Sequence, residues 1–372
     1  SFDEKLKQIK EPLRLTVDVD IQFLIREELL RYQNIFEAKG SAAILMNVNN
    51  GEILSMVSLP DFNLNKRETI KDVNYINRVT KGTYELGSVF KTFTVASGIN
   101  EGLIEPYTEF LDSKKSISCG KNHKIEEYNN KMPSDLTVEQ ILIKSGNVGS
   151  VRIVRKIGIE KHKSFLKTIG VLDKIDFDIE EVGRPIPIDW HEGCKIETIA
   201  FGHGITTTML QLAKGYAIIA NGGYDIKPTL IKKNLNKKSE RKKVLKNDVS
   251  KKMNTILRKV VSEGTAKLVN VEGYQVGGKT GTAEQVVNSK YSNTKINTLA
   301  SIFPTENPKY VLVVMLESTK NNKEYIYEYR DGSGFRLKGS PRNTAGWTSV
   351  EAAGKIIDKI GPILATKYIE IN

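Results

Sequence analysis

The sequence has few of the residues that most often hold metals or build a disulfide framework. Its 372 residues include only two cysteines and four histidines. The histidines are scattered along the chain: His123, His162, His191 and His203. They form no His-Glu-x-x-His or similar cluster, and Cys119 and Cys194 form no Cys-x-x-Cys pair. We therefore expect no metal site and no cofactor. A disulfide between the two cysteines is possible, but two separate thiols fit the sequence at least as well.

Long apolar runs are also missing. No stretch approaches the roughly 20 apolar residues that a helix needs to cross a bilayer, and no signal peptide is visible. Because the chain starts at Ser1 rather than at a methionine, an anchor that preceded it would leave no trace here. Hydrophobic residues make up 39% of the chain and charged residues 27%, which is the balance of a globular protein with a sizeable core.

The charge balance is basic, with a formal net charge of +12. Such a balance suits an anionic partner such as nucleic acid, a membrane surface or an acidic wall polymer, but a lysine-rich protein without such a partner has the same composition. The densest basic run spans residues 232–246, where eight Lys or Arg accompany a single acid, Glu240. No aromatic residue interleaves with this run, so we expect a solvated loop and no nucleic-acid partner.

The periodicity of apolar residues predicts a block of helices between two groups of strands. Strand patterns cover residues 41–46, 52–57, 275–282, 298–303 and 310–316. Helical patterns cover residues 21–36, 89–99, 138–143, 148–157, 208–220 and 350–364. The turn at 49–51 predicts a hairpin between the first two strands, Asp18 or Asp20 is expected to cap the first helix, and 361–362 is expected to break the last one. The stretch 320–346 is polar and irregular. This order predicts an α+β fold with a central antiparallel sheet flanked by helices.

The first motif that carries chemistry is the Ser-x-x-Lys of Ser88 and Lys91. Residues three apart share a face of a helix, so the Lys91 amine can reach the Ser88 hydroxyl. A serine needs an adjacent base to become a nucleophile, and a lysine serves when burial and the helix dipole lower its pKa. Four other Ser-x-x-Lys matches occur, but only Ser88 follows a glycine turn and opens an apolar helix. A helix-capping serine is the competing interpretation.

The second motif is Ser145-Gly146-Asn147, the only Ser-x-Asn in the chain, which lies between two helical patterns. A loop at this place presents its side chains to a cleft. There, a second serine can relay a proton and an asparagine amide can hold a peptide carbonyl. Because Ser, Gly and Asn all favour turns, a plain turn is the better explanation of the motif when it is considered alone.

The third motif is Lys279-Thr280-Gly281-Thr282, on a predicted strand after two glycines. A strand edge can bind a peptide backbone as an added strand, and a glycine allows that backbone to approach closely. Residues 273–280 also match the phosphate-binding pattern Gly-x-x-x-x-Gly-Lys-Thr. That pattern requires a buried strand before it and a helix after it, and the sequence predicts neither. Nucleotide binding therefore remains a remote alternative.

The three motifs occur in the order found in serine β-lactamases and penicillin-binding proteins. With its flanking segments, the chain resembles the class B penicillin-binding proteins. The similar segments are 40–57, 77–78, 84–88, 201–205, 210–213, 220–223, 264–266 and 277–283. The sequences of segments 84–88 and 202–205 are closer to those of the division-specific branch of the family. The resemblance implies a transpeptidase fold over residues 39–372, with residues 1–38 as the last piece of an N-terminal pedestal.

The resemblance also implies that the chain is an enzyme that cross-links peptidoglycan stem peptides through an acyl-serine. Ser88 would attack the penultimate D-Ala carbonyl with Lys91 as base, and Ser145 and Lys279 would pass the proton to the departing D-Ala. The residues implied in substrate binding are Asn147, Thr280, Gly281 and Thr282. The backbone N–H groups of Ser88 and Thr282 would form the oxyanion hole.

Three further expectations follow from the resemblance. β-Lactams would acylate Ser88. A membrane anchor upstream of this chain would hold the enzyme at the periplasmic face of the inner membrane. There it would work with a lipid-linked glycan polymerase and with division proteins. Two rival functions share the motifs: a serine β-lactamase, for which no second base is evident, and a β-lactam sensor domain. Leu86 departs from the family pattern, since many members have proline before the equivalents of Gly87 and Ser88.

Overall fold

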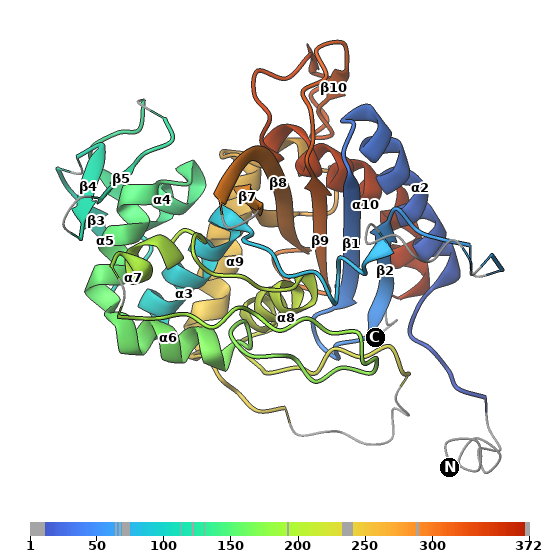
Figure 1. The fold of residues 1–372 in the computed structure, drawn as a ribbon, viewed down its shortest axis with the longest axis horizontal. Helices are drawn as coiled ribbons and strands as arrows, with labels where there is room; N and C mark the ends of the chain where they lie inside the picture. The colour runs from blue at the N-terminus through green and yellow to red at the C-terminus, as the bar shows by residue number, and fades with distance from the viewer. Residues whose placement is uncertain are drawn as a thin grey trace.

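A five-stranded antiparallel sheet forms the centre of the computed structural model (Figure 1). The strand order is β2-β1-β9-β8-β7, and every neighbouring pair is antiparallel. The strands are β1 (Gly40–Asn47), β2 (Ile53–Leu59), β7 (Gly277–Val287), β8 (Lys290–Phe303) and β9 (Tyr310–Glu317). The structure describes residues 12–63, 65–66, 68, 75–112, 114–120, 123–129, 131–191, 193–232, 241–287 and 290–368. The predicted α+β fold with a central antiparallel sheet is confirmed.

The sheet is covered on both faces by helices. One face carries α2 (Val19–Ile35) and α10 (Ser349–Lys367), and the other carries α8 (Met209–Ala220) and α9 (Asn247–Ser262), as Figure 1 shows. The central strand β9 is therefore buried along nearly its whole length and consists almost entirely of apolar residues. The sequence signal of β9 was accordingly a continuous apolar run rather than an alternation.

Apart from α8, which belongs to it, the predicted helical block lies beyond α8 and α9, on the side of β7. It comprises α3 (Lys91–Asn100), α4 (Val138–Lys144), α5 (Asn147–Ile157), α6 (Ile159–Thr168) and the short α7 (Lys195–Ile199). Short 3-10 helices are η3 (Gly87–Phe90), η4 (Lys267–Val269) and η5 (Ala345–Trp347). Two small two-stranded sheets belong to this region: β3 (Glu109–Phe110) with β6 (Leu136–Thr137), and β4 (Ser116–Cys119) with β5 (His123–Glu126). We refer to residues 91–168 and α7 together as the helical lobe.

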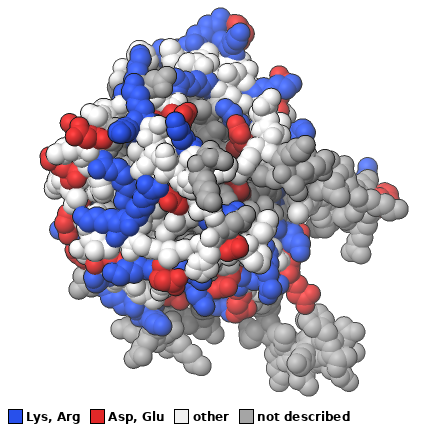
Figure 2. All heavy atoms as spheres, turned by 60° about the vertical axis from the view of Figure 1, so that its left-hand side comes forward, with Lys and Arg blue, Asp and Glu red and all other residues white. Residues whose placement is uncertain are grey.

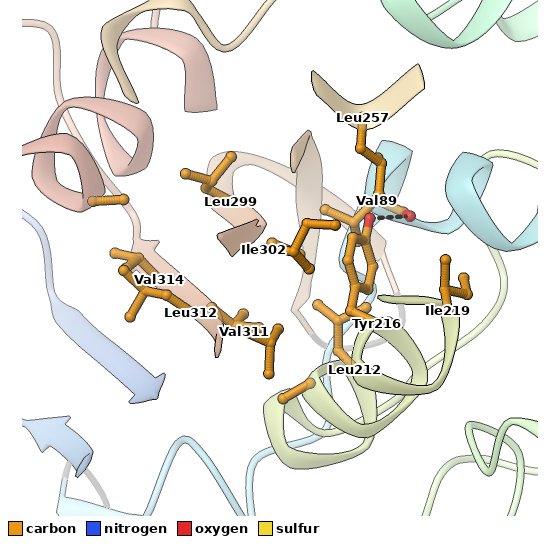
Figure 3. Close-up of a cluster of buried hydrophobic side chains, with 14 of the residues drawn as sticks. Val89, Leu212, Tyr216, Ile219, Leu257, Leu299, Ile302, Val311, Leu312 and Val314 are labelled. Atoms are coloured by element: carbon orange, nitrogen blue, oxygen red, sulfur yellow. Dashed lines mark hydrogen bonds between the residues drawn. The ribbon is translucent and has the colours of Figure 1, made fainter. Parts of the chain in front are cut away.

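The core between the sheet and the helical side fixes the position of η3. Leu212, Tyr216 and Ile219 of α8 and Leu257 of α9 pack near side chains of β8 and β9 (Figure 3). The fully buried Tyr216 hydroxyl donates a hydrogen bond of 2.8 Å to the backbone oxygen of Val89. The residue after Ser88 is therefore tied to the core through its backbone.

The last helix departs from the prediction. The expected break at 361–362 is wrong, because α10 continues through Pro362 to Lys367. Pro362 is exposed, so the backbone hydrogen bond that it cannot make would lie on the solvent side, where water bonds the freed carbonyl. Ile360 and Leu364 are buried on the other side and hold the helix together. Packing therefore outweighs the local preference of proline.

The stretch 320–346 contains more order than its polar composition predicted. Strands β10 (Ile326–Glu328) and β11 (Arg336–Lys338) form a hairpin that projects beyond the sheet (Figure 1). The side chain of Arg330 makes an ion pair of 2.7 Å with Glu351 of α10, and Glu351 is only 1% exposed. Strands of three residues carry almost no periodicity, which is why the sequence did not reveal them.

Three other predictions concern the cap of the first helix, the basic loop and the N-terminal segment. Asp18 caps α2 and accepts hydrogen bonds from two backbone N–H groups of its first turn. Much of the predicted basic loop, residues 233–240, lies outside the described residues. Helix α2 shares the main hydrophobic core, and the assignment of residues 1–38 to a preceding pedestal stays a prediction. Among the described residues, no helix combines the length and the apolar character that a membrane crossing requires.

Candidate active site

The turn that presents Ser88 is built around a glycine. Gly87 has a φ of 62°, in the left-handed region that side chains other than glycine rarely adopt. A Cβ at this position would also lie 2.8 Å from the backbone oxygen of Thr282 on β7. Ser88 follows in η3, immediately before α3 begins at Lys91. The serine was expected to open the helix itself, whereas it occupies the tighter 3-10 turn that leads into it.

Lys91 is fully buried and lies at the point where the first two motifs meet. Its Nζ donates to the backbone oxygen of Ser145 at 2.6 Å, to Ser145 Oγ at 3.3 Å and to Asn147 Oδ1 at 2.7 Å. Burial lowers the pKa of Lys91 to about 7, and the carboxylate of Glu127 acts in the opposite direction. A lysine with this pKa is partly neutral at physiological pH and can accept a proton. Hydrogen bonds to Ser88 Oγ are absent among the described residues, so the direct pairing of Ser88 with Lys91 stays a prediction.

Ser145 lies at the end of α4 in a strained backbone conformation. Its φ and ψ are 60° and 43°, which for a residue other than glycine costs on the order of 1–3 kcal/mol. This conformation places Ser145 Oγ between two lysines, at 3.3 Å from Lys91 Nζ and 2.9 Å from Lys279 Nζ. The plain-turn interpretation of this motif does not account for a side chain that two buried amines contact.

Lys279 reaches the same hydroxyl from β7. It is fully buried, and its Nζ also donates to the backbone oxygen of Thr280 at 3.0 Å. Burial, and then the charge of Lys91, hold the pKa of Lys279 well below its ordinary value. Two amines that share one hydroxyl in a buried site cannot both be charged at low cost, so the pair titrates as a unit. The three motifs, which lie far apart in the sequence, therefore meet at Ser145 Oγ.

Strand β7 is the edge strand of the sheet, and its free edge approaches the nucleophile turn. A Cβ on Gly281 would lie 2.1 Å from the backbone oxygen of Leu86, so only a glycine fits there. The Thr280 hydroxyl forms a hydrogen bond of 2.7 Å with Thr265 Oγ1. The strand also excludes the phosphate-binding interpretation of 273–280, because the lysine of that pattern lies within a β-strand and no helix follows it.

The Thr282 hydroxyl is already engaged within the protein. It donates to Asn297 Oδ1 at 3.0 Å and accepts from the backbone N–H of Ala345 at 3.0 Å. Thr282 is one of the residues that the resemblance implied in substrate binding. In this arrangement the hydroxyl proton is directed to Asn297, so the hydroxyl has no free proton for a ligand.

A cavity of about 680 Å³ opens at the meeting point of the motifs. Ser88, Ser145, Asn147, Thr280 and Thr282 all line it. Its other lining residues are Gly87, Tyr128, Phe201, His203, Gly264, Thr265, Lys267, Leu268, Lys295, Tyr329, Arg342, Thr344, Gly346 and Trp347. Basic side chains occur among these residues, whereas Asp and Glu do not, within the part of the chain that the structure describes. The lining therefore suits a ligand that carries carboxylates.

The charge of the outer surface is more evenly mixed than that of the cavity. Figure 2 shows lysine and arginine side chains across the face on the left of Figure 1, with acidic side chains between them. On this face the basic side chains form no single uninterrupted stripe. The face shown in Figure 2 therefore does not indicate a specific binding partner for the positive charge.

The sequence motifs missed Glu127, which supports the second motif. Its carboxylate accepts hydrogen bonds from the backbone N–H groups of Asn147 at 2.7 Å and Val148 at 2.9 Å, at the start of α5. A carboxylate at a helix N-terminus is stabilising, because it meets both the free N–H groups and the positive end of the helix dipole. Glu127 lies 20 residues away in an unrelated segment, so no local pattern could have identified it.

The two cysteines, whose pairing the sequence left open, form a disulfide. Cys119 ends β4, and Cys194 precedes α7. The bond therefore ties the β4–β5 hairpin, which leads directly to Glu127, to the segment that continues to Phe201 and His203 at the cavity. Both sides of the covalent link thus end at residues that line or support the cleft.

Comparisons with known proteins agree with this geometry. The family model described as the penicillin binding protein transpeptidase domain matches residues 41–331. A relative from Caulobacter vibrioides, named probable peptidoglycan D,D-transpeptidase FtsI, is 29% identical, and the match covers 96% of this chain and 59% of the relative. Stage V sporulation protein D of Bacillus subtilis is 30% identical, with 84% of this chain and 50% of the relative covered. The chain thus spans about half to three fifths of the length of these relatives.

Solved structures show the same fold. The transpeptidase domain of Burkholderia pseudomallei penicillin-binding protein 3 has a TM-score of 0.79 at 24% identity, and the match covers 96% of this chain and 97% of that one. Penicillin-binding protein 3 of Mycobacterium tuberculosis, solved in complex with aztreonam, also has a TM-score of 0.79 at 24% identity, with 94% and 79% covered. Since the family model matches most of its length, at residues 41–331, the chain described here belongs to the family of penicillin-binding protein transpeptidase domains.

Proposed function

We propose that this chain is the catalytic domain of a peptidoglycan D,D-transpeptidase that acts through an acyl-enzyme at Ser88. The observation that carries the proposal is the meeting of Lys91 and Lys279 at Ser145 Oγ, beside the cavity that Ser88 lines. A serine that lines a cleft, with two buried amines of lowered pKa nearby, has what acyl transfer requires: a nucleophile, a base and a path for the proton.

In the first half-reaction, Ser88 Oγ attacks the carbonyl between the two D-alanines of a donor stem peptide. Lys91, whose pKa is about 7, takes the hydroxyl proton. The proton then passes to the departing D-Ala nitrogen through Ser145 Oγ, which lies between Lys91 and Lys279. The backbone N–H groups of Ser88 and Thr282 are the proposed donors to the oxyanion, and a pair of fixed donors is worth several kcal/mol, about 2.7–4 for one of them.

The donor peptide is proposed to lie along the free edge of β7, as an added strand beside Gly281. Asn147 would hold a peptide carbonyl from the opposite side of the cleft. Thr280, linked to Thr265, would contact the terminal carboxylate. The basic cavity lining supports this orientation, because a stem peptide carries carboxylates.

In the second half-reaction, a primary amine of a neighbouring stem peptide takes the acyl group from Ser88. A β-lactam, which mimics D-Ala-D-Ala, would acylate the same serine and remain bound because deacylation is slow. We further propose that the full-length protein acts in septal wall synthesis at the periplasmic face of the inner membrane. In that setting, an upstream anchor and pedestal would precede residue 39, with a lipid-linked glycan polymerase and division proteins as partners.

Mass spectrometry of the intact protein after incubation with a penicillin tests this function. We expect one stable adduct on the wild type and no adduct on Ser88→Ala, with both proteins equally folded by circular dichroism. The lifetime of the adduct separates the rival functions, because a β-lactamase would release it within seconds. Absence of an adduct on folded wild type would refute the assignment of Ser88.

A sensor domain would also keep the adduct, so a second assay is needed. The protein is given an N-acyl-D-alanyl thioester as donor and a D-amino acid as amine acceptor. We expect the amide product to form catalytically with the wild type and not with Ser88→Ala. A single turnover without amide product would favour the sensor.

A further inference from the structure

The loop after α7 runs beside the segment that leads to Ser88. Tyr84 and Thr207 form an antiparallel bridge with two backbone hydrogen bonds, of 2.9 and 3.0 Å. Residues 201–207 therefore pass along residues 84–88 in the opposite direction. This places residues of the loop close to the nucleophile although more than 100 positions separate them in the sequence.

Close backbone contact fixes the distance between the two segments. A Cβ on Gly202 would lie 2.0 Å from the backbone oxygen of Gly87, the residue before Ser88. Gly202 also has a φ of 84°, so its conformation and its surroundings both require glycine. His203, the next residue, lines the same cavity as Ser88.

The imidazole of His203 is held by its neighbours but keeps its nitrogens available. Its ring centroid lies 5.8 Å from that of Phe201 and 5.1 Å from that of Tyr291. Glu85 accepts a hydrogen bond of 3.1 Å from the backbone N–H of Gly204, and the Tyr291 hydroxyl donates to the same carboxylate at 3.4 Å. Neither ring nitrogen of His203 has a hydrogen-bond partner among the residues that the structure describes.

The electrostatic surroundings of this histidine differ from those of the rest of the cavity. The charged or titratable groups around His203 and its two contacts, Glu85 and Tyr291, come from several elements. Glu85 interacts with Lys195 of α7, Tyr291 of β8 interacts with Glu284 of β7, and Lys295 of β8 lines the same cavity. Burial raises the pKa of Glu85, while the positive charge of His203 and the hydrogen bond from Gly204 lower it. The described cavity lining itself holds basic and neutral residues only. Glu85, which contacts Gly204 and Tyr291 on either side of His203, is therefore an acidic group at the edge of this lining.

We propose that His203, positioned by Glu85, accepts a proton from the primary amine that takes the acyl group from Ser88. This inference rests on the transpeptidase function proposed above. An alkyl amine arrives as an ammonium ion, and its nitrogen can attack only after it loses a proton. Lys91 and Lys279 are fully buried, whereas His203 lines the cavity that Ser88 also lines.

The proposed step balances as follows. A ring nitrogen of His203 takes one proton from the ammonium and becomes an imidazolium beside the Glu85 carboxylate. The neutral amine attacks the ester carbonyl, a C–N bond forms, and the bond from the carbonyl carbon to Ser88 Oγ breaks. The second amine proton passes by way of Lys91 to Ser88 Oγ, and the imidazolium releases its proton to water. No oxidant, reductant or metal is needed.

A comparison of two acceptors tests this role. An N-acyl-D-alanyl thioester acylates the enzyme, and the amide product is measured with either D-alanine, which is largely protonated at neutral pH, or hydroxylamine, which is largely neutral. For His203→Phe, we expect about a 10²-fold loss of transfer to D-alanine and less than about a threefold loss with hydroxylamine. Phenylalanine keeps the aromatic contacts, so a packing role alone would leave both rates unchanged.

The outcomes separate this inference from the proposed function. The ratio of transfer to D-alanine over transfer to hydroxylamine carries the test, because both acceptors share the same acylation of Ser88, and penicillin acylation in the same preparations reports whether each variant still presents that serine. Equal losses with both acceptors, or no loss with either, would overturn the role of His203 while the acyl-enzyme mechanism stands. Failure of wild type to be acylated would instead sink the proposed function itself.

Two further variants sharpen the test. Glu85→Gln keeps an acceptor for the Gly204 N–H but removes the charge, and we expect a smaller loss, again confined to D-alanine. His191→Phe is the matched control, since His191 is exposed and does not line the cavity. It should behave as wild type with both acceptors. A Glu85→Gln loss of the same size with hydroxylamine would count against a role through His203.

Discussion

The two walls of the cleft are held in place in different ways. The sheet wall, β7, is fixed by a continuous antiparallel ladder to β8 and by glycine contacts with the nucleophile turn. The helical wall, which carries Ser145 and Asn147, depends on a few side chains: the Glu127 carboxylate, the buried Lys91 and the disulfide from Cys119 to Cys194. We therefore expect the sheet wall to tolerate most side-chain changes, but not a Cβ atom added to a glycine at the close contact. The helical wall should be sensitive to the loss of single side chains.

The largest expected effect is therefore a steric one on the sheet wall. Gly281→Ala places a Cβ about 2.1 Å from the Leu86 oxygen and forces β7 away from the turn that holds Ser88. A misplacement on the order of 1 Å costs about 10²-fold in rate, so we expect at least that loss of penicillin acylation, measured with a fluorescent penicillin. Gly334→Ala is the control, because its φ of 66° is strained but nothing lies within 4 Å. Equal acylation by both variants would contradict this account of the sheet wall.

On the helical wall, loss of the disulfide should give the largest effect. The bond closes a separation of 75 residues, for which the chain-entropy model predicts a stabilisation of about 4 kcal/mol. We expect the Cys119→Ser/Cys194→Ser variant, and the wild type in reductant, to show a lower midpoint in urea unfolding. Reductant should have no effect on the double variant. If the midpoint of the wild type does not move in reductant, the covalent link contributes little to this wall.

A buried histidine should make the stability of the helical lobe depend on pH. His162 of α6 is 1% exposed, and neither ring nitrogen has a hydrogen-bond partner within the described part of the chain. Burial lowers its pKa from 6.5 to about 4. Between pH 4 and pH 6.5, the folded state therefore binds fewer protons than the unfolded state. The neutral His162 makes its full contribution to the free energy of unfolding above pH 6.5, and this contribution is lost as the pH falls to 4. This difference in the pKa of His162 corresponds to about 3 kcal/mol in the free energy of unfolding.

The variant His162→Leu checks this expectation. We expect the free energy of unfolding to depend less on pH between 4 and 6.5 in the variant than in the wild type. Hydrogen exchange should show that acid opens α6 and α3 before β8 and β9. If the helices α6 and α3 and the strands β8 and β9 of the wild type exchange together in acid, the difference between the two walls does not extend to their stability.

The smallest expected effect concerns the acid limb of acylation. Lys91 must lose its proton to act as base, so acylation should rise with pH through about 7. Glu127 raises the pKa of Lys91 against the effect of burial, and Glu127→Gln should therefore move this limb to lower pH. The variant also weakens the cap of α5, at a cost of about 1 kcal/mol. Acylation rates of the wild type and of Glu127→Gln are measured across pH 5–9. A shift of the acid limb to higher pH in the variant would contradict the effect assigned to Glu127 on the pKa of Lys91.

Much of the sheet side could be predicted from the sequence because its signals are local. The turn at 49–51 predicted the β1–β2 hairpin, and the apolar run at 310–316 predicted β9 within one residue. Asp18 was one of two residues expected to cap α2. In each case the neighbouring residues determine the backbone, so a short window of sequence carries the information.

The supports of the helical wall could not be predicted in the same way. Glu127 acts on Asn147 across 20 positions, and Cys119 finds Cys194 across 75. The three motifs indicated which residues would meet, but not that Ser145 Oγ would be the common point of two buried lysines. Such contacts depend on how α4, α5 and β7 pack together, which no local pattern encodes. The continuation of α10 through Pro362 has the same origin, since tertiary packing overrides the local preference.

The left-handed conformation of Ser145 has a consequence for the evolution of this domain. At a φ of 60°, glycine would relieve the backbone strain. Backbone strain therefore favours glycine at this position, and the hydroxyl that the two buried lysines contact opposes that change. Copies of this domain that no longer carry out the chemistry should lose this serine early, while the buried lysines, whose removal leaves unfilled polar space, should persist longer.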